Sequence, residues 1–283
     1  VPGIDGLNIG AGYYESNYDL AANARSNRNE GTVYATYAIG ALTVGAQVGA
    51  IGAQGVGAAT TEDSCNLADH AASNGVTAIM LAPRPIRTQT QDDLFEYFTE
   101  VSKAASGIEV MLQDAPEYLG IDLNTELIKR LSDEIKNIAY IKSEKTPVSN
   151  TIYDLKQIFS QRNIGLFGGQ AAVGFFELLE SGGTGTIPGC EATSILVRIW
   201  DDYVIKKNNN KAKEIFEKVL PFFVFEMQSL EMFIKCTKTV LFRKGLISSN
   251  ETRNDFKLSP IAQSILDRHI LRITEIEKHL KRR

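Results

Sequence analysis

The sequence predicts an α/β fold, a (β/α)8 TIM barrel followed by a C-terminal helical appendage. From about residue 51 onward, short apolar runs alternate with amphipathic stretches of helical length, which is typical of a parallel α/β fold. Each apolar run is entered from a glycine or asparagine turn. None of the first strand-to-helix turns carries a glycine-rich dinucleotide fingerprint, which favours a closed barrel over an open sheet.

Five strand candidates and their helices can be placed in order along the chain. We expect helices over residues 61–73, 88–105, 124–135, 151–160 and 171–180. The strand candidates read "VTAIMLAP", "IEVMLQDAP", "NIAYIK", "NIGLFGG" and "GGTGTIPG". After about residue 210 the strands stop, and helical periodicity continues over residues 211–225, 225–244 and 250–281. The sequence therefore predicts a barrel over residues 1–209 and a helical region over residues 210–283.

The amino-terminal segment, residues 1–58, differs in composition from the rest of the chain. It contains no lysine and is rich in glycine and alanine. Three further strand candidates, "GLNIGAG", "TVYATYAIG" and "TVGAQVGAIGAQG", bring the total to seven or eight. The favoured interpretation is a glycine-rich start to the barrel, with the first strand and helix missing or replaced. The alternative is a set of hairpin strands like those of outer-membrane porins, with a tight turn at Gly40.

Composition and charge limit the classes of partner. The 283 residues carry a net charge of −4 with both signs interspersed, which gives no broad positive surface for nucleic acid. The uncharged stretch from residue 31 to 61 alternates in a strand-like way, which disfavours a membrane helix. Three distant cysteines without CxxC spacing indicate neither a disulfide framework nor a zinc site. We expect buried thiols, no metal and a cytoplasmic protein.

One predicted strand ends on a lysine. In "NIAYIKSE", Lys142 and Glu144 share one face of the strand, because side chains alternate. In a barrel this lysine would lie at the carboxyl end of the strand, where such barrels place their chemistry. A buried ammonium is costly unless it is paired or loses its proton, and a neutral amine can form a Schiff base with a ketone. The alternative is a lysine that only forms a salt bridge with Glu144.

These motifs resemble those of the dihydrodipicolinate synthase and N-acetylneuraminate lyase superfamily of Schiff-base aldolases and dehydratases. "NIAYIKSE" resembles the strand with the imine-forming lysine, which maps onto Lys142. "GLFGGQAAVGFFELLESGGTGTIPG" resembles the next two strands, with Gly168 and Gly169 at a strand end and the backbone around Ile187 holding the keto acid carboxylate. The resemblance covers roughly residues 50–260. It implies a barrel that uses no cofactor and forms a homo-oligomer, either a dimer or a tetramer.

Three departures from the family pattern bear on the substrate. The family's usual tyrosine stretch reads "QDAP" here and places Gln113 in the tyrosine's position, although an amide cannot shuttle protons as a phenol does. The Thr-Thr-Gly-Glu turn is matched only by "GYYE", which contains Tyr14. The arginine of true dihydrodipicolinate synthases is absent, since "PEYLG" offers Tyr118. These features resemble more closely the branch that dehydrates 2-keto-3-deoxy sugar acids.

The resemblance implies a lyase that forms an imine between Lys142 and a 2-keto acid. We expect dehydration, or aldol cleavage, of a 2-keto-3-deoxy sugar acid, with Glu144 as the proton relay. The expected substrate-binding residues are Gln113, Gly168, Gly169, Ile187 and Tyr14. The alternative is a barrel that has lost catalysis and acts as a keto-acid binding or regulatory protein.

Three other polar residues follow predicted strands. Arg84 and Arg87 lie in "PRPIRTQTQ" and are candidates for recognising a distal carboxylate or sugar hydroxyls, or else are solvated loop arginines. Asp114 shares a strand face with Leu112, opposite Gln113. We therefore expect Asp114 to be a structural carboxylate of the turn.

Overall fold

A computed structural model of the chain describes residues 7–16, 28–39, 42–48, 60–74, 76, 78–84 and 86–281. In the first three of these ranges it describes the backbone of strands, without side chains. The chain divides into two compact units. The α/β unit consists of Ala50–Gly169 and Gly174–Thr186, and the second unit of Val1–Gly49, Gln170–Val173 and Ile187–Arg283. The predicted boundary at residue 210 stays a prediction.

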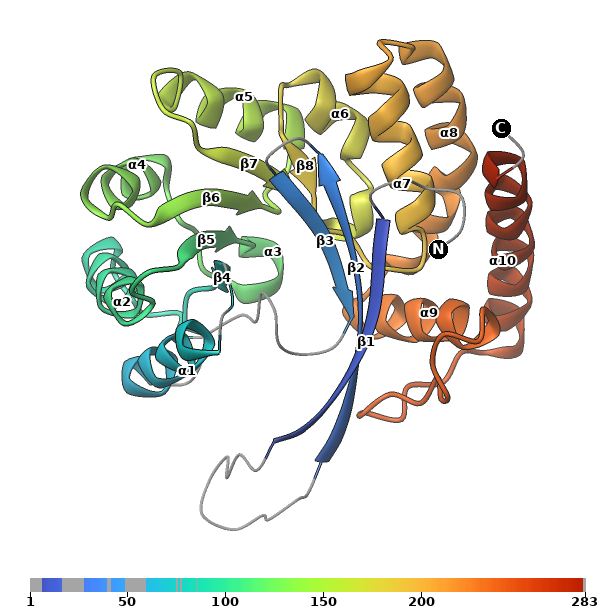
Figure 1. Ribbon diagram of the computed structural model, residues 1–283, viewed down its shortest axis with the longest axis horizontal. Coiled ribbons are helices and arrows are strands. Elements are labelled where there is room, and N and C mark those ends of the chain that lie inside the picture. Colours follow the sequence, from blue (N-terminus) through green and yellow to red (C-terminus); the bar gives the residue numbers. More distant parts are fainter. Residues whose placement is uncertain are drawn as a thin grey trace. The chain divides into compact units, whose positions relative to one another are not determined.

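The α/β unit contains a five-stranded parallel sheet whose strands follow the order of the chain (Figure 1). Its strands are β4 (Ala78–Leu81), β5 (Glu109–Asp114), β6 (Ile138–Ser143), β7 (Gly165–Gly168) and β8 (Gly185–Thr186). Its helices are α1 (Thr61–Ser73), α2 (Gln91–Ala104), α3 (Pro116–Leu119), α4 (Thr125–Glu134), α5 (Val148–Ile158) and α6 (Phe175–Glu180). Each of the five strands predicted for this region is present, and helices connect them as parallel neighbours require.

Capping side chains fix where the longer helices of this unit begin. The Thr90 hydroxyl accepts a hydrogen bond from Asp93 N, and the Asp93 carboxylate accepts one from Thr90 N, which is a capping box at the start of α2. Asn124 Oδ1 accepts from Leu127 N at 2.7 Å at the start of α4. These caps fix the residues at which the connections that leave β4 and β5 end and the helices α2 and α4 begin.

The face of each strand is set by its apolar residues. Leu112 of β5 and Ile141 of β6 are partners in the parallel register, and both are fully buried. A Cβ at Gly168 of β7, on the same face, would meet Leu178 of α6, so this face packs against the helices. Burial of such side chains contributes about 25 cal/mol per Å² of apolar surface. Residues one position out of phase, Gln113 and Lys142 among them, lie on the opposite face.

The strands of the second unit form a separate antiparallel sheet in the order β1 (Leu7–Ser16), β2 (Arg28–Ile39), β3 (Leu42–Val48). Only residues 40 and 41 separate β2 from β3, and so short a connection joins antiparallel neighbours, because a parallel crossover needs a dozen or more residues. Both pairings in this sheet are antiparallel, and the two interpretations of residues 1–58 stay predictions. Gly40, the predicted turn, lies outside the described residues.

The helices of the second unit follow β8. They are α7 (Thr193–Trp200), a π-helical turn η2 (Asp201–Ile205), α8 (Asn209–Glu226), α9 (Leu230–Arg243) and α10 (Pro260–Lys281). The predicted helices over residues 211–225 and 225–244 correspond to α8 and α9, which the capping residue Ser229 separates. The helix predicted over residues 250–281 begins ten residues later, at Pro260.

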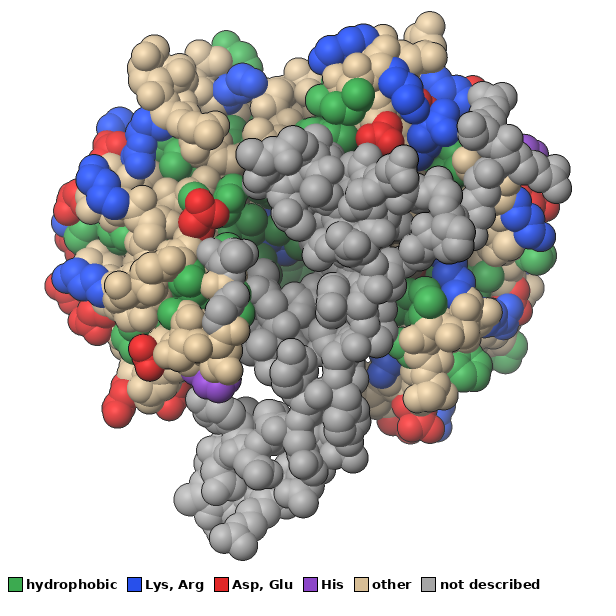
Figure 2. All heavy atoms as spheres, viewed as in Figure 1, with side chains coloured by type: hydrophobic (Ala, Val, Ile, Leu, Met, Phe, Trp, Pro, Cys, Tyr) green, Lys and Arg blue, Asp and Glu red, His purple; other side chains and the backbone are tan. Residues whose placement is uncertain are grey.

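Surface and cysteine features bear on the expected partners. Figure 2 shows basic and acidic side chains interspersed over the visible face, as the composition predicts. Within the described ranges, no helix combines the length and apolar character needed to cross a membrane. All three cysteines are free thiols; Cys236 is buried as expected, whereas Cys65 and Cys190 are partly exposed.

Candidate active site

Strand β6 brings Lys142 and Glu144 together at the carboxyl edge of the parallel sheet. Glu144 directly follows the strand, and its backbone N–H donates a 2.7 Å hydrogen bond to Asp114 O of β5, which extends the sheet ladder. Lys142 Nζ lies 3.1 Å from Glu144 Oε2, and each side chain is only 9% exposed. The predicted shared face of these two residues is therefore present, and the amine is both buried and paired.

Gln113 completes a three-residue arrangement around one carboxylate oxygen. Gln113 is the register partner of Lys142 on the neighbouring strand β5. Its Nε2 donates a 2.7 Å hydrogen bond to Glu144 Oε2, the same oxygen that faces the lysine. Hydrogen bonds to an ionised acceptor are stronger than neutral ones, so the amide and the ammonium together fix the position of the Glu144 carboxylate.

The two glycines at the end of β7 have different surroundings. A Cβ at Gly169 would lie 2.2 Å from Glu144 Oε1, so a residue without a side chain is required for the carboxylate to lie where it does. A Cβ at Gly168 would instead meet Leu178 Cδ1 at 2.6 Å. Gly169 therefore belongs to the site, whereas the missing side chain of Gly168 leaves space for helix packing.

An aromatic side chain lies next to the lysine on the other side. Phe167 of β7 is the register partner of Lys142 and is 4% exposed. Its ring packs edge-on against Tyr140, with centroids 5.8 Å apart. A Cβ at Gly185 of β8 would meet the Phe167 ring at 2.8 Å. The face of the sheet around the amine is therefore apolar on the β7 side and polar on the β5 side.

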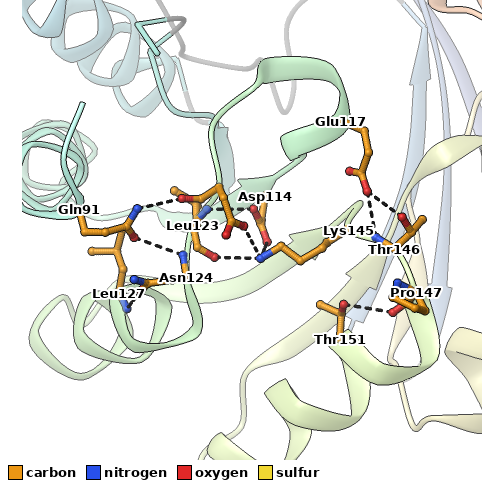
Figure 3. Close-up of polar contacts among 11 residues, drawn as sticks. Gln91, Asp114, Glu117, Leu123, Asn124, Leu127, Lys145, Thr146, Pro147 and Thr151 are labelled. Atoms are coloured by element: carbon orange, nitrogen blue, oxygen red, sulfur yellow. Dashed lines mark hydrogen bonds and ion pairs between the residues drawn. The ribbon is translucent and has the colours of Figure 1, made fainter. Parts of the chain in front are cut away.

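A second polar network holds the loop after β5 against the residue that follows Glu144 (Figure 3). Lys145 Nζ lies 3.5 Å from Asp114 Oδ2, donates to Leu123 O at 3.3 Å and pairs with Asp122. Leu123 N donates to Asp114 Oδ1 at 3.3 Å. Burial raises the pKa of Asp114 to about 6, although the nearby Lys145 ammonium opposes the shift. These contacts agree with the expected structural role of Asp114.

The remaining predicted residues belong to other parts of the chain. Tyr14 lies in β1 opposite Glu30, and its side chain is outside the described part of the chain. Ile187 follows β8 and belongs to the second unit. Arg84 donates from Nε to Gln89 Oε1 at 3.1 Å and lies over the Tyr97 ring, which commits its guanidinium to local contacts.

Sequence reasoning gave no role to Phe167, and it treated Tyr118 only as the absence of an arginine. The parallel register places Phe167 beside Lys142, and such a register cannot be read from one strand alone. Tyr118 lies on α3, just past the end of β5. Among the described residues, no cluster of three or more His, Cys, Asp or Glu side chains is arranged to hold a metal ion.

Comparison with known proteins places this arrangement in a family. The family model described as the Dihydrodipicolinate synthetase family matches residues 38–266. The chain belongs to this family. The predicted superfamily is thereby confirmed, while the predicted sugar acid dehydratase branch within it stays a prediction.

Curated relatives of the dihydrodipicolinate synthetase family are distant in sequence. The 4-hydroxy-tetrahydrodipicolinate synthase of Sulfurovum sp. (strain NBC37-1) is 27% identical over 131 residues, which cover 46% of this chain and 42% of the relative. The enzyme of the same name from Sulfurimonas denitrificans is 25% identical over 205 residues, 70% of this chain and 65% of the relative. The matched part of the chain therefore spans 42% and 65% of the length of these two members of the family.

Solved structures of the family share the fold. Dihydrodipicolinate synthase from Rhodopseudomonas palustris aligns with a TM-score of 0.71 at 22% identity, covering 77% of this chain and 73% of that one. The wild-type sialic acid aldolase of Ruminococcus gnavus aligns with a TM-score of 0.69 at 20% identity, covering 78% and 73%. This likeness confirms the predicted TIM-barrel fold class, of which the described parallel sheet supplies five strands.

Proposed function

We propose that the protein is a Schiff-base-forming lyase that acts on a 2-keto acid, by dehydration or aldol cleavage of a 2-keto-3-deoxy sugar acid. The observation that carries the proposal is the buried Lys142 amine, 3.1 Å from the Glu144 carboxylate at the end of a parallel strand. Family membership supports it. One of the similar structures is a sialic acid aldolase whose catalytic lysine has been mutated, which supports lysine-based chemistry.

The first chemical step is formation of the imine. The Lys142 ammonium passes a proton to Glu144 Oε2, and the neutral amine adds to the C2 carbonyl of the keto acid. The carbonyl oxygen then leaves as water, with one proton from the amine and the proton that Glu144 had received. A protonated imine remains. The apolar Phe167 side limits the access of water, which would otherwise reverse this step.

The second step is elimination. The protonated imine withdraws electrons from C3, so a C3 proton can pass to a base, for which Glu144 is the nearest carboxylate in the described site. The electron pair left on C3 expels the C4 hydroxyl, which leaves as water after accepting a proton. Hydrolysis of the imine then frees the amine, so the net change is loss of one water from the keto acid.

Dehydration requires fewer proton-transferring side chains at this site than aldol cleavage does. Aldol cleavage needs a group to take a proton from the C4 hydroxyl, which a phenol does well and the Gln113 amide cannot do. Gln113 Nε2 instead donates a 2.7 Å hydrogen bond to Glu144 Oε2 and so keeps that carboxylate oriented. This contact favours elimination over cleavage.

Borohydride trapping tests the proposal directly. The protein is incubated with pyruvate and sodium borohydride, and the reduced adduct is mapped by mass spectrometry. We expect the adduct on Lys142 in the wild type, no adduct in Lys142→Ala, and an undiminished adduct in Lys103→Ala, which removes an exposed lysine of α2. Product analysis with a 2-keto-3-deoxy sugar acid then separates one product lighter by water from two fragments.

The ion pair itself favours a second candidate function. A lysine held by Glu144 is also what a barrel without catalysis would contain, acting as a keto-acid binding or regulatory protein. Such a protein would bind pyruvate in calorimetry but would give no borohydride adduct. Absence of the adduct on Lys142 refutes the lyase proposal and leaves this alternative.

Two further expectations are carried as proposals. We propose that the protein forms a homo-oligomer and that it acts in the cytoplasm. Light scattering coupled to gel filtration measures the first, and fractionation of cells that produce the protein measures the second. A monomer at micromolar concentration, or recovery outside the cytoplasmic fraction, would contradict them.

A further inference from the structure

We infer that Lys145 is a positioning residue for the proposed reaction. Its side chain fastens the turn after strand β6 to the loop after strand β5, and this attachment holds the Glu144 carboxylate next to the Lys142 amine. The inference rests on the proposed function, because it concerns the rate at which the same site forms an imine.

The ammonium of Lys145 reaches across to the loop between β5 and α4 (Figure 3). Its Nζ lies 3.5 Å from Asp114 Oδ2, donates a hydrogen bond to Leu123 O at 3.3 Å and pairs with Asp122. Leu123 N in turn donates to Asp114 Oδ1 at 3.3 Å. Asp114 is the last residue of β5, and Leu123 lies next to Asn124, which caps α4. The Lys145 side chain therefore connects both ends of this loop to the turn that leaves β6.

Glu144 is attached to the same loop through its backbone. Its N–H donates a 2.7 Å hydrogen bond to Asp114 O, so Asp114 holds Glu144 with its carbonyl group and faces Lys145 with its carboxylate. The backbone on both sides of the Glu144 Cα atom is thereby fixed. Because the rotamers open to a side chain depend on its backbone angles, this arrangement limits where the Glu144 carboxylate can point.

The Glu144 carboxylate has little room to move. Its Oε2 lies 3.1 Å from Lys142 Nζ, and its Oε1 would lie 2.2 Å from a Cβ at Gly169. Gln113 Nε2 donates to Oε2 at 2.7 Å from the neighbouring strand β5. A small rotation of the Glu144 backbone would therefore lengthen the contact with the amine or press the carboxylate against the end of β7.

The contact from Lys145 is harder for water to replace than the one from the next residue, Thr146. Asp114 is 1% exposed, and a buried charge that loses its partner is costly. Thr146 donates from N and Oγ1 to Glu117 Oε1, but these hydrogen bonds are exposed. Water can take over exposed hydrogen bonds at small net cost. We therefore expect removal of the Lys145 side chain to shift the turn.

The rate of borohydride trapping of pyruvate tests the inference. Burial raises the pKa of Asp114 to about 6, so its carboxylate is ionised at pH 8, where the rate is measured. For Lys145→Met we expect this rate to fall about three- to tenfold, the size of one lost hydrogen bond in the activation barrier. The final extent of trapping and the half-saturating concentration of pyruvate should stay unchanged, whereas a loss of folded protein would lower the extent.

Two matched variants accompany this measurement. Lys145→Arg keeps a cation at the position and should recover most of the rate. Lys129→Met removes an exposed lysine of α4 that pairs with Asp133, and it should leave the rate unchanged.

A double-mutant cycle shows whether Lys145 acts through Asp114. In an Asp114→Asn background, Lys145→Met should cause no further decrease in the trapping rate. Asp122→Asn changes the partner that is 57% exposed, and it should keep the wild-type rate.

The pH profile gives a readout that a purely structural role would not move. Among the described residues, Lys145 and Asp122 are the charged groups that act on Asp114. As the pH falls from 8 to 5, Asp114 gains a proton and Lys145 loses the charge that it faces. The ratio of the wild-type trapping rate to the Lys145→Met rate should therefore fall toward one, while groups that titrate alike in both proteins cancel from the ratio.

The inference is overturned if Lys145→Met traps pyruvate at the wild-type rate, or if Lys129→Met slows trapping equally. It is also overturned if Lys145→Met keeps its full effect in the Asp114→Asn background, or if the ratio of the two rates does not depend on pH. Absence of an adduct on Lys142 in the wild type would overturn the proposed function itself, and this inference with it.

Discussion

Gln113 Nε2 donates a 2.7 Å hydrogen bond to Glu144 Oε2, across the boundary between two parallel strands. The amide is not a substitute proton carrier, since it has no readily ionised group. It is an orienting group that holds the carboxylate next to the Lys142 amine, which lies 3.1 Å from the same oxygen. The chemistry of this site is therefore concentrated in one carboxylate with two fixed donors.

Removing the Gln113 amide should destabilise the protein and slow imine formation. Gln113→Leu removes the 2.7 Å hydrogen bond to Glu144 Oε2, the oxygen that also faces the Lys142 amine. A hydrogen bond to a charged group contributes roughly 1.5–3 kcal/mol, so we expect a loss of that order in the free energy of unfolding in urea. Gln157→Leu, on the exposed face of α5, is the control. Equal losses for the two variants would contradict the orienting role.

Substitutions at Gly168, the last residue of β7, and at Gly169, which follows it, should separate an effect on imine formation from an effect on stability. Gly169→Ala would place a Cβ 2.2 Å from Glu144 Oε1, so we expect the carboxylate to be displaced and the rate of borohydride trapping to fall at least tenfold, the effect of about 1.4 kcal/mol. Gly168→Ala meets the flexible end of Leu178 instead, so it should lower the melting temperature with trapping retained. Retained trapping in Gly169→Ala would show that the carboxylate does not need its present position.

Asp114 should make stability depend on pH in the acid range. Its pKa is raised by burial to about 6 from an ordinary value near 3.8. A raised carboxyl pKa means that the unfolded chain releases its proton first, so the free energy of unfolding should fall between pH 4 and pH 6, by about 3 kcal/mol in total, and stay low above. Asp114→Asn should remove this decline, whereas Asp69→Asn, at an exposed position of α1, should keep it.

The buried carboxyl pair of the second unit should also make the free energy of unfolding fall as the pH rises. Glu191 and Glu226 are both fully buried, and Thr237 Oγ1 donates to Glu191 Oε2 at 3.0 Å. Burial raises the pKa of each, and the charge of Glu191 raises that of Glu226 further. Their contribution to stability is complete below pH 4.5 and declines as the pH rises above it.

Glu226→Gln replaces a carboxyl group whose pKa is raised by burial and by the charge of Glu191 with a neutral group of the same shape. We expect this variant to be more stable than the wild type at pH 8 and to have a flatter profile of unfolding free energy from pH 5 to pH 8. Glu217→Gln, on the exposed face of α8, should reproduce the wild-type profile. Parallel profiles for all three proteins would mean that the pair stays protonated throughout this range.

The α/β unit was predictable because its signals are local. The bounds of α1 are those expected, since Thr60 caps its start. Lys142 and Glu144 were placed together because two residues of one strand must share a face. The surroundings of Gly168 depend on Leu178 of a later helix, and tertiary packing of this kind leaves no mark in a short motif. The predicted binding role of Gly168 stays a prediction.

The rest of the fold depends on strand pairing and on element boundaries, which a short sequence motif does not reveal. The antiparallel pairing of β2 and β3 follows from a connection of two residues, a constraint that was noted only as a turn at Gly40. Helix α7 was not predicted, because its residues follow the glycine-rich "GGTGTIPG" stretch without an expected boundary. The site residues Tyr14 and Ile187 stay predictions.

Because Lys142 of β6 and Glu144, which directly follows this strand, are two positions apart, the extended backbone of one short segment sets their separation. The proposed nucleophile and its proposed acid–base partner thus lie in one short peptide and need no contact between distant segments of the chain to meet.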